Sequence, residues 1–320
     1  MLHILQVTFP FFALVLLGFV ATRRGLLPVA AISGLNAFVL FFALPCMLYR
    51  FGARTPLAQL LDLRLAAIYL LASLLVIGLT VSLTRRGAMG WNDAAFGALV
   101  AAFPNSGFMG VPLMVALLGA PAAGPVIVTL VLDLVLASSL CIALSRLEST
   151  GLQGAEVAAL KALRGVATNP MPWSILMGAL ALGTGWELPA PLMQTVNLLA
   201  DAASPVALFT IGAVLARSQM EGLARGQAVA VRDWAGVVVI KLVLHPLLVG
   251  GLGWTAIQAG MALDPFTLTV AVLVAALPSA SNVSLLAERF GADNGRIARI
   301  ILWSTAISFF SFSAAVFWLT

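Results

Sequence analysis

The sequence predicts an all-α integral membrane protein with ten transmembrane helices, arranged as two inverted five-helix repeats in which crossover helices 4 and 9 are broken. The first supporting observation is composition. Of the 320 residues, 62% are hydrophobic and 9% are charged, and the mean hydropathy is +1.08, which is far outside the range of soluble domains. The second is that hydrophobic stretches of membrane-spanning length recur from end to end. The third is a proline-centred polar cluster that occurs once in each half.

Ten hydrophobic segments account for most of the chain, and one longer polar connection divides them into two sets of five. In this connection Val157, Leu160 and Leu163 stand at helical spacing, which predicts a short helix at the membrane interface. We therefore divide the chain into a first repeat (1–145), a cytoplasmic connector (146–169) and a second repeat (170–320). The predicted spans are 3–22, 34–51, 65–84, 93–118, 122–145, 170–185, 191–216, 233–256, 266–287 and 296–319.

The placement of lysine and arginine predicts the orientation, because cytoplasmic loops of membrane proteins collect these residues. With the N-terminus outside, Arg50, Arg54 and Arg64 fall on the outer side and Lys241 falls within a span. Both termini are therefore predicted to be extracytoplasmic. Because each half has an odd number of spans, the second half is expected to lie in the membrane in the inverted orientation, as in many secondary transporters. The other thirteen of the seventeen fall on the cytoplasmic side: Arg23, Arg24, Arg85, Arg86, Arg146, Lys161, Arg164, Arg217, Arg225, Arg232, Arg289, Arg296 and Arg299.

The two halves share a polar interruption within a span. The stretch "AAFPNS" at 101–106 in the fourth span is echoed by "AALPSAS" at 275–281 in the ninth. More loosely, "LNAFVLFFALP" at 35–45 is echoed by "VNLLADAASP" at 196–205. Proline removes a backbone donor and collides with the preceding turn, so each polar cluster predicts a helix broken into two half-helices. The backbone groups that such a break frees must be buried in protein or line a wet cavity.

These breaks are predicted to form the substrate site. A half-helix end carries about half an elementary charge, positive at the N-terminus, so two crossing breaks present dipole ends to a bound anion or cation. Neighbouring asparagine and serine side chains add neutral hydrogen-bonding groups. The predicted substrate-binding residues are Pro104, Asn105, Ser106 and Gly107 in the fourth span, and Pro278, Ser279, Ser281 and Asn282 in the ninth.

Four ionisable residues lie inside predicted spans: Asp133, Asp201, Lys241 and His245. A charge at the bilayer centre costs about 2.5–3.5 kcal/mol and needs a partner or water, so we interpret the four as ion-coupling or charge-pairing residues, with Na⁺ or H⁺ as the coupling ion. Lys241 and His245 are four residues apart and share a helical face. The lysine could attract a carboxylate or pair with either aspartate. Asp133 suits a structural hydrogen bond and a proton or cation site equally. His245 suits a packed neutral histidine, although a titration near neutrality would suit proton coupling.

Several motifs, in order along most of the chain, resemble those of the auxin efflux carrier family in its compact bacterial form. They read "LNAFVLFFALPCMLYRF", "FPNSGFMGVPL", "TNPMPWSILMGAL", "SPVALFTIGAVLA", "KLVLHPLL" and "ALPSASNVSLLAERFGADNGRIARIILWSTAISF". The resemblance implies a bacterial inner-membrane carrier with separate scaffold and transport subdomains that move in an elevator manner. It also implies export or exchange of small organic anions, such as malate- or malonate-like carboxylates or auxin-like acids.

The resemblance further implies which residues contact the substrate. In the family, the crossover asparagine and prolines do so, and the matching positions are Pro104, Asn105 and Pro278. In the ninth span the asparagine, Asn282, stands four residues after Pro278 instead of directly after it. The architecture is also related to that of bile acid:sodium symporters and sodium/proton antiporters. In the antiporters a membrane lysine pairs with an aspartate, which by analogy suggests such a role for Lys241.

Other classes of function lack support in the sequence. No phosphate-binding loop, zinc-protease or serine-hydrolase motif is found, so we predict a protein that is not an enzyme and uses no metal or cofactor beyond a coupling ion. The net charge of +5 comes from basic residues scattered between spans, which disfavours a nucleic-acid partner. The expected partners are a small organic anion and the lipid bilayer, and Gly- and Ala-rich faces favour a homodimer. The alternatives are a cation- or proton-coupled antiporter and a membrane sensor that binds its ligand without moving it.

Overall fold

A computed structural model describes residues 2–86, 89–147, 157, 160, 164–165, 167–224 and 230–320. The regular elements of these residues are helices, which confirms the all-α membrane class. The helix predicted around Leu163 in the connector falls largely outside the described residues. Seven of the described helices are long and apolar enough to cross a membrane: His3–Arg23, Ala31–Gly52, Leu57–Arg85, Ala120–Leu144, Ala190–Gly222, Val231–Gln258 and Asn294–Leu319.

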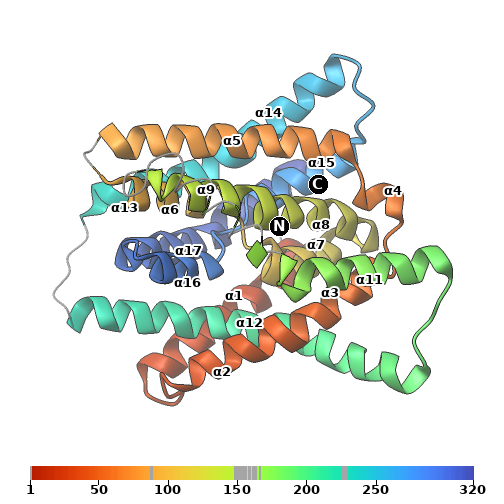
Figure 1. Cartoon of the computed structure of the whole chain (residues 1–320), viewed down its shortest axis with the longest axis horizontal. Helices are drawn as coiled ribbons and strands as arrows, with labels where there is room; N and C mark the ends of the chain where they lie inside the picture. Colours follow the sequence, from red (N-terminus) through yellow and green to blue (C-terminus); the bar gives the residue numbers. More distant parts are fainter. Residues whose placement is uncertain are drawn as a thin grey trace.

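Several long helices contain a π-helical segment, and two are interrupted. Figure 1 shows the arrangement of the α-helices. The elements of the first half are α1 (Leu2–Arg23), α2 (Ala31–Phe38), η1 (Val39–Ala43), α3 (Leu44–Gly52), α4 (Leu57–Leu60), α5 (Leu63–Arg86), α6 (Trp91–Ala102), η2 (Ser106–Gly110), α7 (Val111–Leu118), η3 (Ala120–Ala122), α8 (Ala123–Leu132), η4 (Asp133–Ala137) and α9 (Ser138–Leu144). Those of the second half are α11 (Pro170–Thr184), α12 (Ala190–Ala224), α13 (Val231–Val239), η5 (Ile240–Leu244), α14 (His245–Gln258), α15 (Pro265–Ala275), α16 (Asn282–Phe290) and α17 (Asn294–Leu319).

Local sequence fixes several of the helix ends. Asn169, Asp264 and Asp293 precede α11, α15 and α17, and each accepts a hydrogen bond from a backbone N–H of the first turn. Gly185 and Gly291 follow α11 and α16 with φ of 67° and 70°, the left-handed conformation that commonly ends a helix. Caps and glycines at these positions satisfy the helix termini without tertiary contacts.

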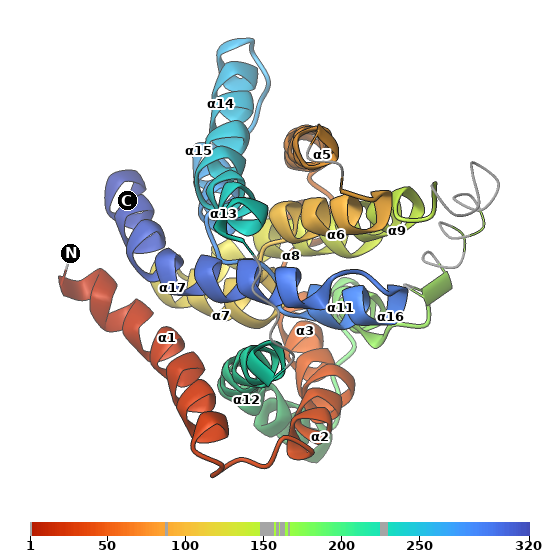
Figure 2. The ribbon, with the colours of Figure 1, turned by 90° about the vertical axis from the view of Figure 1, so that its left-hand side faces the viewer.

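The helices form two packed groups. We define bundle A as α1, α2–α3, α11 and α12, in which α1 and α3 pack on α12 and α11 packs on α3. Bundle B comprises α5–α9 and α13–α17, in which α5 packs on α6 and α14, α15 on α8 and α14, and α17 on α13. In Figures 1 and 2, α12 of bundle A and α5 of bundle B lie on opposite sides of the molecule.

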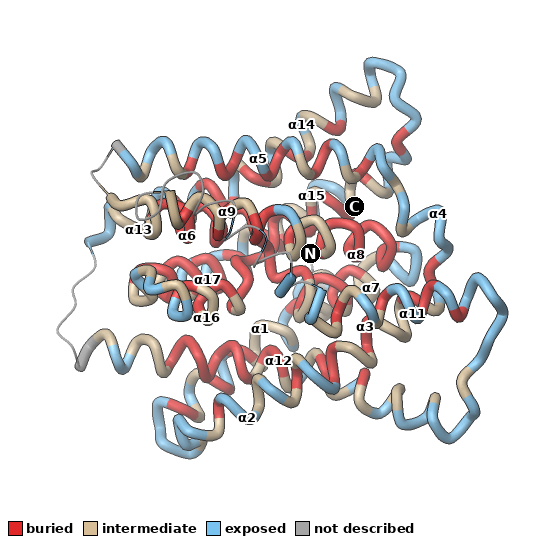
Figure 3. Tube along the Cα trace, in the orientation of Figure 1, coloured by how far each residue is buried: buried red, intermediate tan, exposed pale blue. Residues whose placement is uncertain are grey.

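Burial is greatest in the interrupted helices of bundle B. Every residue of α6 from Ala94 to Ala102 is buried, as is every residue of α8 from Ala123 to Leu130, and Figure 3 shows α8 largely in red. In the hydrophobic window of α1, by contrast, 22% of the residues are buried. This arrangement meets a requirement of the membrane, where backbone groups without helical partners are tolerated only away from lipid.

Glycine allows the closest helix approaches in bundle A. A Cβ atom at Gly212 of α12 would lie 1.9 Å from the backbone oxygen of Val15 in α1. A Cβ atom at Gly178 of α11 would lie 2.3 Å from the backbone oxygen of Tyr49 in α3. Both contacts are with main-chain atoms of a neighbouring helix, which can relieve a clash only by moving the helix. Small residues at these two crossings therefore hold bundle A together, as is common in membrane bundles.

A buried arginine joins three helices of bundle B at their N-terminal ends. Arg296 of α17 is 2% exposed, and its guanidinium donates to the carbonyl oxygens of Asp233 (2.7 Å) and Asp93 (2.9 Å), in α13 and α6. The sequence predicts Arg296 on the cytoplasmic side. In the structure its side chain satisfies backbone groups inside the protein.

We expect Gly212→Ala to lower the melting temperature of the detergent-solubilised protein. The added methyl group would force α1 away from α12, and overpacking of this kind costs about 1–3 kcal/mol. Gly251→Ala is the matched control, because Gly251 lies in α14 with open space at its Cβ position, and alanine is the better helix former. Equal melting temperatures for both variants would contradict the close crossing of α1 and α12.

Candidate functional site

The structure interrupts two helices where the sequence predicts breaks. α6 ends at Ala102 and η2 begins at Ser106, and α15 ends at Ala275 and α16 begins at Asn282. Pro104 and Pro278 lie in the two gaps. Each proline therefore stands where the chain has left helical geometry, as expected from its missing N–H group.

The two unwound segments pair with each other. The N–H of Asn105 donates to the carbonyl of Pro278 (2.8 Å), and the N–H of Ala280 donates to the carbonyl of Phe103 (2.9 Å). Together these hydrogen bonds form a short antiparallel bridge, centred on Pro104 and Ser279. Each break thus supplies the donor and acceptor that the other has lost, which is the compensation required at membrane depth.

Serine hydroxyl groups near the breaks support this bridge. Ser279 donates to the carbonyl of Val100 (2.7 Å), and its own N–H donates to the hydroxyl of Ser304 (3.2 Å). The Ser106 hydroxyl lies 3.4 Å from the carbonyl of Pro104. Ser281 is buried immediately before α16. Among the predicted site residues, Ser106 and Ser279 therefore direct their hydroxyl groups to neighbouring backbone.

A small cavity lies beside the bridge, at the boundary of the two bundles. Its volume is ≈20 Å³, which is room for about one water molecule. Asn105 and Asn282 supply its polar side chains. The Oδ1 atom of Asn282 is buried without a partner. The side-chain amide of Asn105 forms no hydrogen bond among the described residues. The lining residues are Leu44 and Met171 from bundle A, and Phe103, Pro104, Asn105, Gly107, Phe108, Leu130, Leu134, Ala280 and Asn282 from bundle B.

Two half-helices begin at this cavity. The segment Ser106–Leu118 (η2 and α7) and helix α16 both have their N-terminal ends beside it, marked by Gly107 and Asn282 in the lining. Helix N-termini carry partial positive charge and unpaired N–H groups, which suit an anion. The lining contains no charged side chain, so these ends and the two asparagine amides dominate its polarity.

Lys241 contacts the C-terminal end of α15, the half-helix that leads into the second break. This residue lies in η5, is fully buried, and donates from Nζ to the carbonyl oxygen of Ala275 (2.6 Å), the last residue of α15. Its Nζ atom also lies 3.4 Å from Nδ1 of His245. A cation at a helix C-terminus compensates the negative end of the dipole. Lys241 therefore offsets the negative end of α15 and leaves the positive ends uncompensated.

Asp133 lies close to Lys241 but is held by a different residue. The Tyr69 hydroxyl of α5 donates to Oδ2 of Asp133 (2.9 Å), and both residues are fully buried. The Tyr69 ring also packs against His245, with centroids 5.7 Å apart. Asp133 and Lys241 interact electrostatically, although the salt bridges found among the described residues do not include this pair. Asp133, Lys241 and His245 thus share one buried cluster.

The fourth predicted ionisable residue lies elsewhere. Asp201 of α12 is exposed and forms a salt bridge of 2.6 Å with Arg50, in the last turn of α3. This pair joins two helices of bundle A, whereas the cluster of Asp133 lies in bundle B. Of the two aspartates that the sequence offered as partners for Lys241, only Asp133 is close to it.

Sequence reasoning missed Tyr69. A lone tyrosine in an apolar span carries no charge and does not stand out among aromatic residues. One signal was available, because the chain has only two tyrosines, and a tyrosine hydroxyl inside the membrane needs a hydrogen-bond partner.

Comparisons with known proteins agree with the sequence motifs. Residues 3–317 match the family described as "Membrane transport protein". The chain is 31% identical over 314 residues to a "Putative malonate transporter" of Rhizobium meliloti (strain 1021), covering 96% of this chain and 93% of the relative. It is 30% identical to an uncharacterized transporter of Escherichia coli (strain K12), covering 88% and 86%. It is 23% identical to "Auxin efflux carrier component 8" of Arabidopsis thaliana, covering 96% and 94%.

We expect Lys241→Met to destabilise the protein more than Lys241→Arg. Methionine leaves the Ala275 carbonyl without its donor, and a buried polar group left unpaired costs about 1–3 kcal/mol. Arginine keeps both a donor and a positive charge near the end of α15. Thermal unfolding of the three proteins in the same detergent would measure the difference. If both variants melted at the wild-type temperature, the contact between Lys241 and Ala275 would contribute nothing to stability.

Proposed function

We propose that this chain, which belongs to the membrane transport protein family of the auxin efflux carriers, is a secondary transporter of small organic anions. The family assignment makes the protein a membrane transporter and not an enzyme. The substrate class rests on the geometry of the site together with the names of two relatives, one described as a "Putative malonate transporter" and the other as "Auxin efflux carrier component 8". We place the protein in the bacterial inner membrane.

The observation that carries this proposal is the cavity on which two half-helix N-termini converge. Their partial positive charges and the amides of Asn105 and Asn282 suit a carboxylate. Lys241 offsets the negative end of α15 at the same break. A cation would instead need free carbonyl groups at helix C-termini or a carboxylate in the lining. The carbonyl of Phe103 at the end of α6 already accepts from Ala280, and the lining contains no carboxylate.

We further propose ten spans in two inverted repeats. Seven of the described helices are long and apolar enough to cross the membrane, and we assign the remaining three spans to α11, to α6 with α7, and to α15 with α16. Helix contacts support the symmetry when each span of the first half is matched with the span five later. The pair α1·α12 then corresponds to α3·α11, α5·α6 to α14·α15, and α6·α9 to α15·α17. With the cytoplasmic excess of arginine, this topology puts both termini outside.

An elevator movement of bundle B along bundle A would load and release the substrate. The site belongs mostly to bundle B, and Leu44 and Met171 of bundle A cover it. At ≈20 Å³ the cavity is too small for a dicarboxylate, so loading requires the bundles to move. An apolar cavity of ≈350 Å³ lies along the same boundary, between α4, α5, α8 and α11. Bundle B is the proposed transport subdomain and bundle A the scaffold.

A thermal-shift panel of mono- and dicarboxylates tests the substrate class. An anion that binds the folded protein raises its melting temperature with concentration, by mass action. We expect malonate or a related carboxylate to raise the melting temperature. Salts of the same inorganic cations without a carboxylate should leave it unchanged. A melting temperature that responded to none of the carboxylates would contradict the anion site.

We expect Asn105→Ala to abolish uptake of the active anion into proteoliposomes without unfolding the protein. The bridge uses only the backbone N–H of Asn105, so alanine keeps the bridge and removes the amide from the cavity. Asn197→Ala is the matched control, because Asn197 lies in α12 of bundle A and outside the cavity lining. Wild-type flux in Asn105→Ala would remove the break from the substrate site. Binding without flux in the wild type would instead indicate a sensor.

A further inference from the structure

We propose that Asp133 is the proton-binding group of this transporter, and that a water molecule held between Asp133 and Ser73 takes part in its proton exchange. The inference rests on the proposed anion transport, because it names the coupling ion as H⁺. It concerns a site separate from the anion cavity, in which neither Asp133 nor Ser73 takes part.

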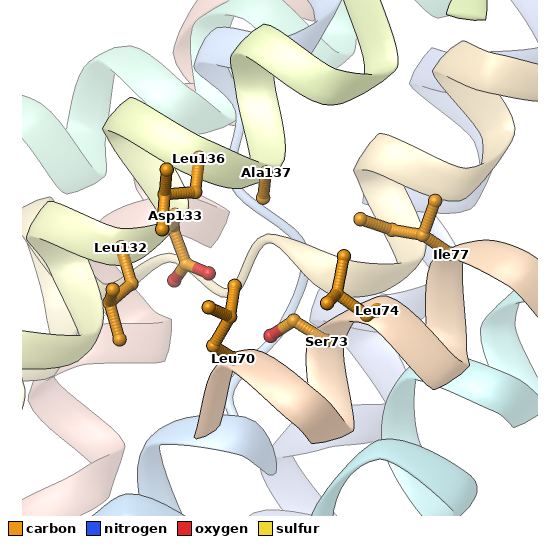
Figure 4. A pocket seen from close by; sticks show the side chains of 8 residues that line it. All are labelled: Leu70, Ser73, Leu74, Ile77, Leu132, Asp133, Leu136 and Ala137. Atoms are coloured by element: carbon orange, nitrogen blue, oxygen red, sulfur yellow. The ribbon is translucent and has the colours of Figure 1, made fainter. Parts of the chain in front are cut away.

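The geometry around Asp133 leaves one carboxylate oxygen available. Oδ2 accepts the hydrogen bond from Tyr69, whereas Oδ1 is buried without a partner. The Ser73 hydroxyl of α5 is also buried without a partner. Both residues line a cavity of ≈10 Å³ between α5 and the helix that contains η4 (Figure 4). This volume is close to the minimum for one water molecule, which would satisfy both groups.

A proton can bind here without breaking existing contacts. A charged carboxylate is costly to bury unless its oxygens are hydrogen-bonded. When Asp133 is ionised, Oδ1 accepts a hydrogen bond from the water. When it is protonated, Oδ1–H donates to the same water, which can reorient toward Ser73. Both protonation states therefore have a complete set of hydrogen bonds, while Oδ2 keeps its contact with Tyr69.

The cavity between Asp133 and Ser73 is a poor binding site for Na⁺. A metal ion must replace its hydration shell with several oxygen atoms, and the cavity offers two side-chain oxygens that are not already hydrogen-bonded. The groups facing Asp133 are Tyr69 of α5, Lys241 of η5 and His245 of α14. None of them is an anion that would attract a second cation, and the charge of Lys241 repels it.

Lys241 connects the proton site to the anion site. It interacts electrostatically with Asp133 and donates to the C-terminal end of α15 at the break. While Asp133 is ionised, its charge balances that of Lys241. Protonation adds one positive charge to bundle B and leaves the lysine unbalanced, so the break then binds an anion more tightly. Proton and anion therefore bind together and cross in the same direction, one proton with each anion.

Infrared titration of the solubilised protein without substrate tests the proton site. We expect the wild type to show a protonated-carboxyl band that titrates with pH and does not respond to Na⁺. The band should disappear in Asp133→Asn and persist in Glu187→Gln, a control at an exposed carboxylate between α11 and α12. Ser73→Ala and Tyr69→Phe remove one contact each and should shift the same band. A band that survived in Asp133→Asn, or that Na⁺ displaced, would overturn the proposal.

Malonate binding and flux test the coupling separately. Linkage to one proton predicts that malonate affinity falls about tenfold per pH unit above the titration of Asp133, where malonate is fully ionised. In Asp133→Asn, malonate affinity should not change over the same pH range. Malonate entry into wild-type proteoliposomes should acidify a trapped pH dye equally in sodium and potassium salts. Malonate flux without proton movement would overturn the coupling but leave anion transport intact, whereas failure of every carboxylate would overturn the proposed function and leave the infrared result standing.

Discussion

The structure depends on one constraint, that backbone groups freed by proline inside a membrane must find partners within the protein. The two breaks meet this constraint by pairing with each other, through Asn105 with Pro278 and Phe103 with Ala280. Because each segment supplies what the other lacks, neither can shift independently. The pairing holds two half-helix N-termini at a single cavity and keeps the asparagine amides out of the bridge. The cavity lined by dipoles and amides, which we propose as the substrate site, is thus a consequence of satisfying the backbone.

The buried cations follow a related rule. Lys241 and Arg296 both donate to backbone carbonyl oxygens instead of to a carboxylate. Lys241 thereby stabilises the end of a broken helix, and Arg296 joins three helix ends. Asp133 is left with a tyrosine hydroxyl as its hydrogen-bond donor among the described residues. An acid held by a hydroxyl group instead of by a close ion pair keeps this hydrogen bond in both protonation states, which makes it suitable for binding a proton.

Much of the candidate site could be predicted from residue types, because proline, asparagine and glycine are conspicuous in an apolar span. Asn105 and Asn282 line the cavity accordingly. The serines were harder to place, since a hydroxyl can face a cavity or return to the backbone, as that of Ser279 does. Tyr69 and Ser73 gave little signal. Their importance depends on the rotation of α5, which places them against Asp133.

The sequence by itself determined the membrane class, the family and the positions of both breaks, because hydrophobic length and proline chemistry act within a single segment. Only the tertiary structure decided that the two breaks pair with each other and that Lys241 lies at the end of α15. It also decided that Asp201 forms a salt bridge with Arg50, whereas Asp133 is hydrogen-bonded by Tyr69. These outcomes depend on which helices become neighbours and on how each is rotated. That choice is made by packing, such as the glycine crossings of bundle A, between residues more than a hundred positions apart.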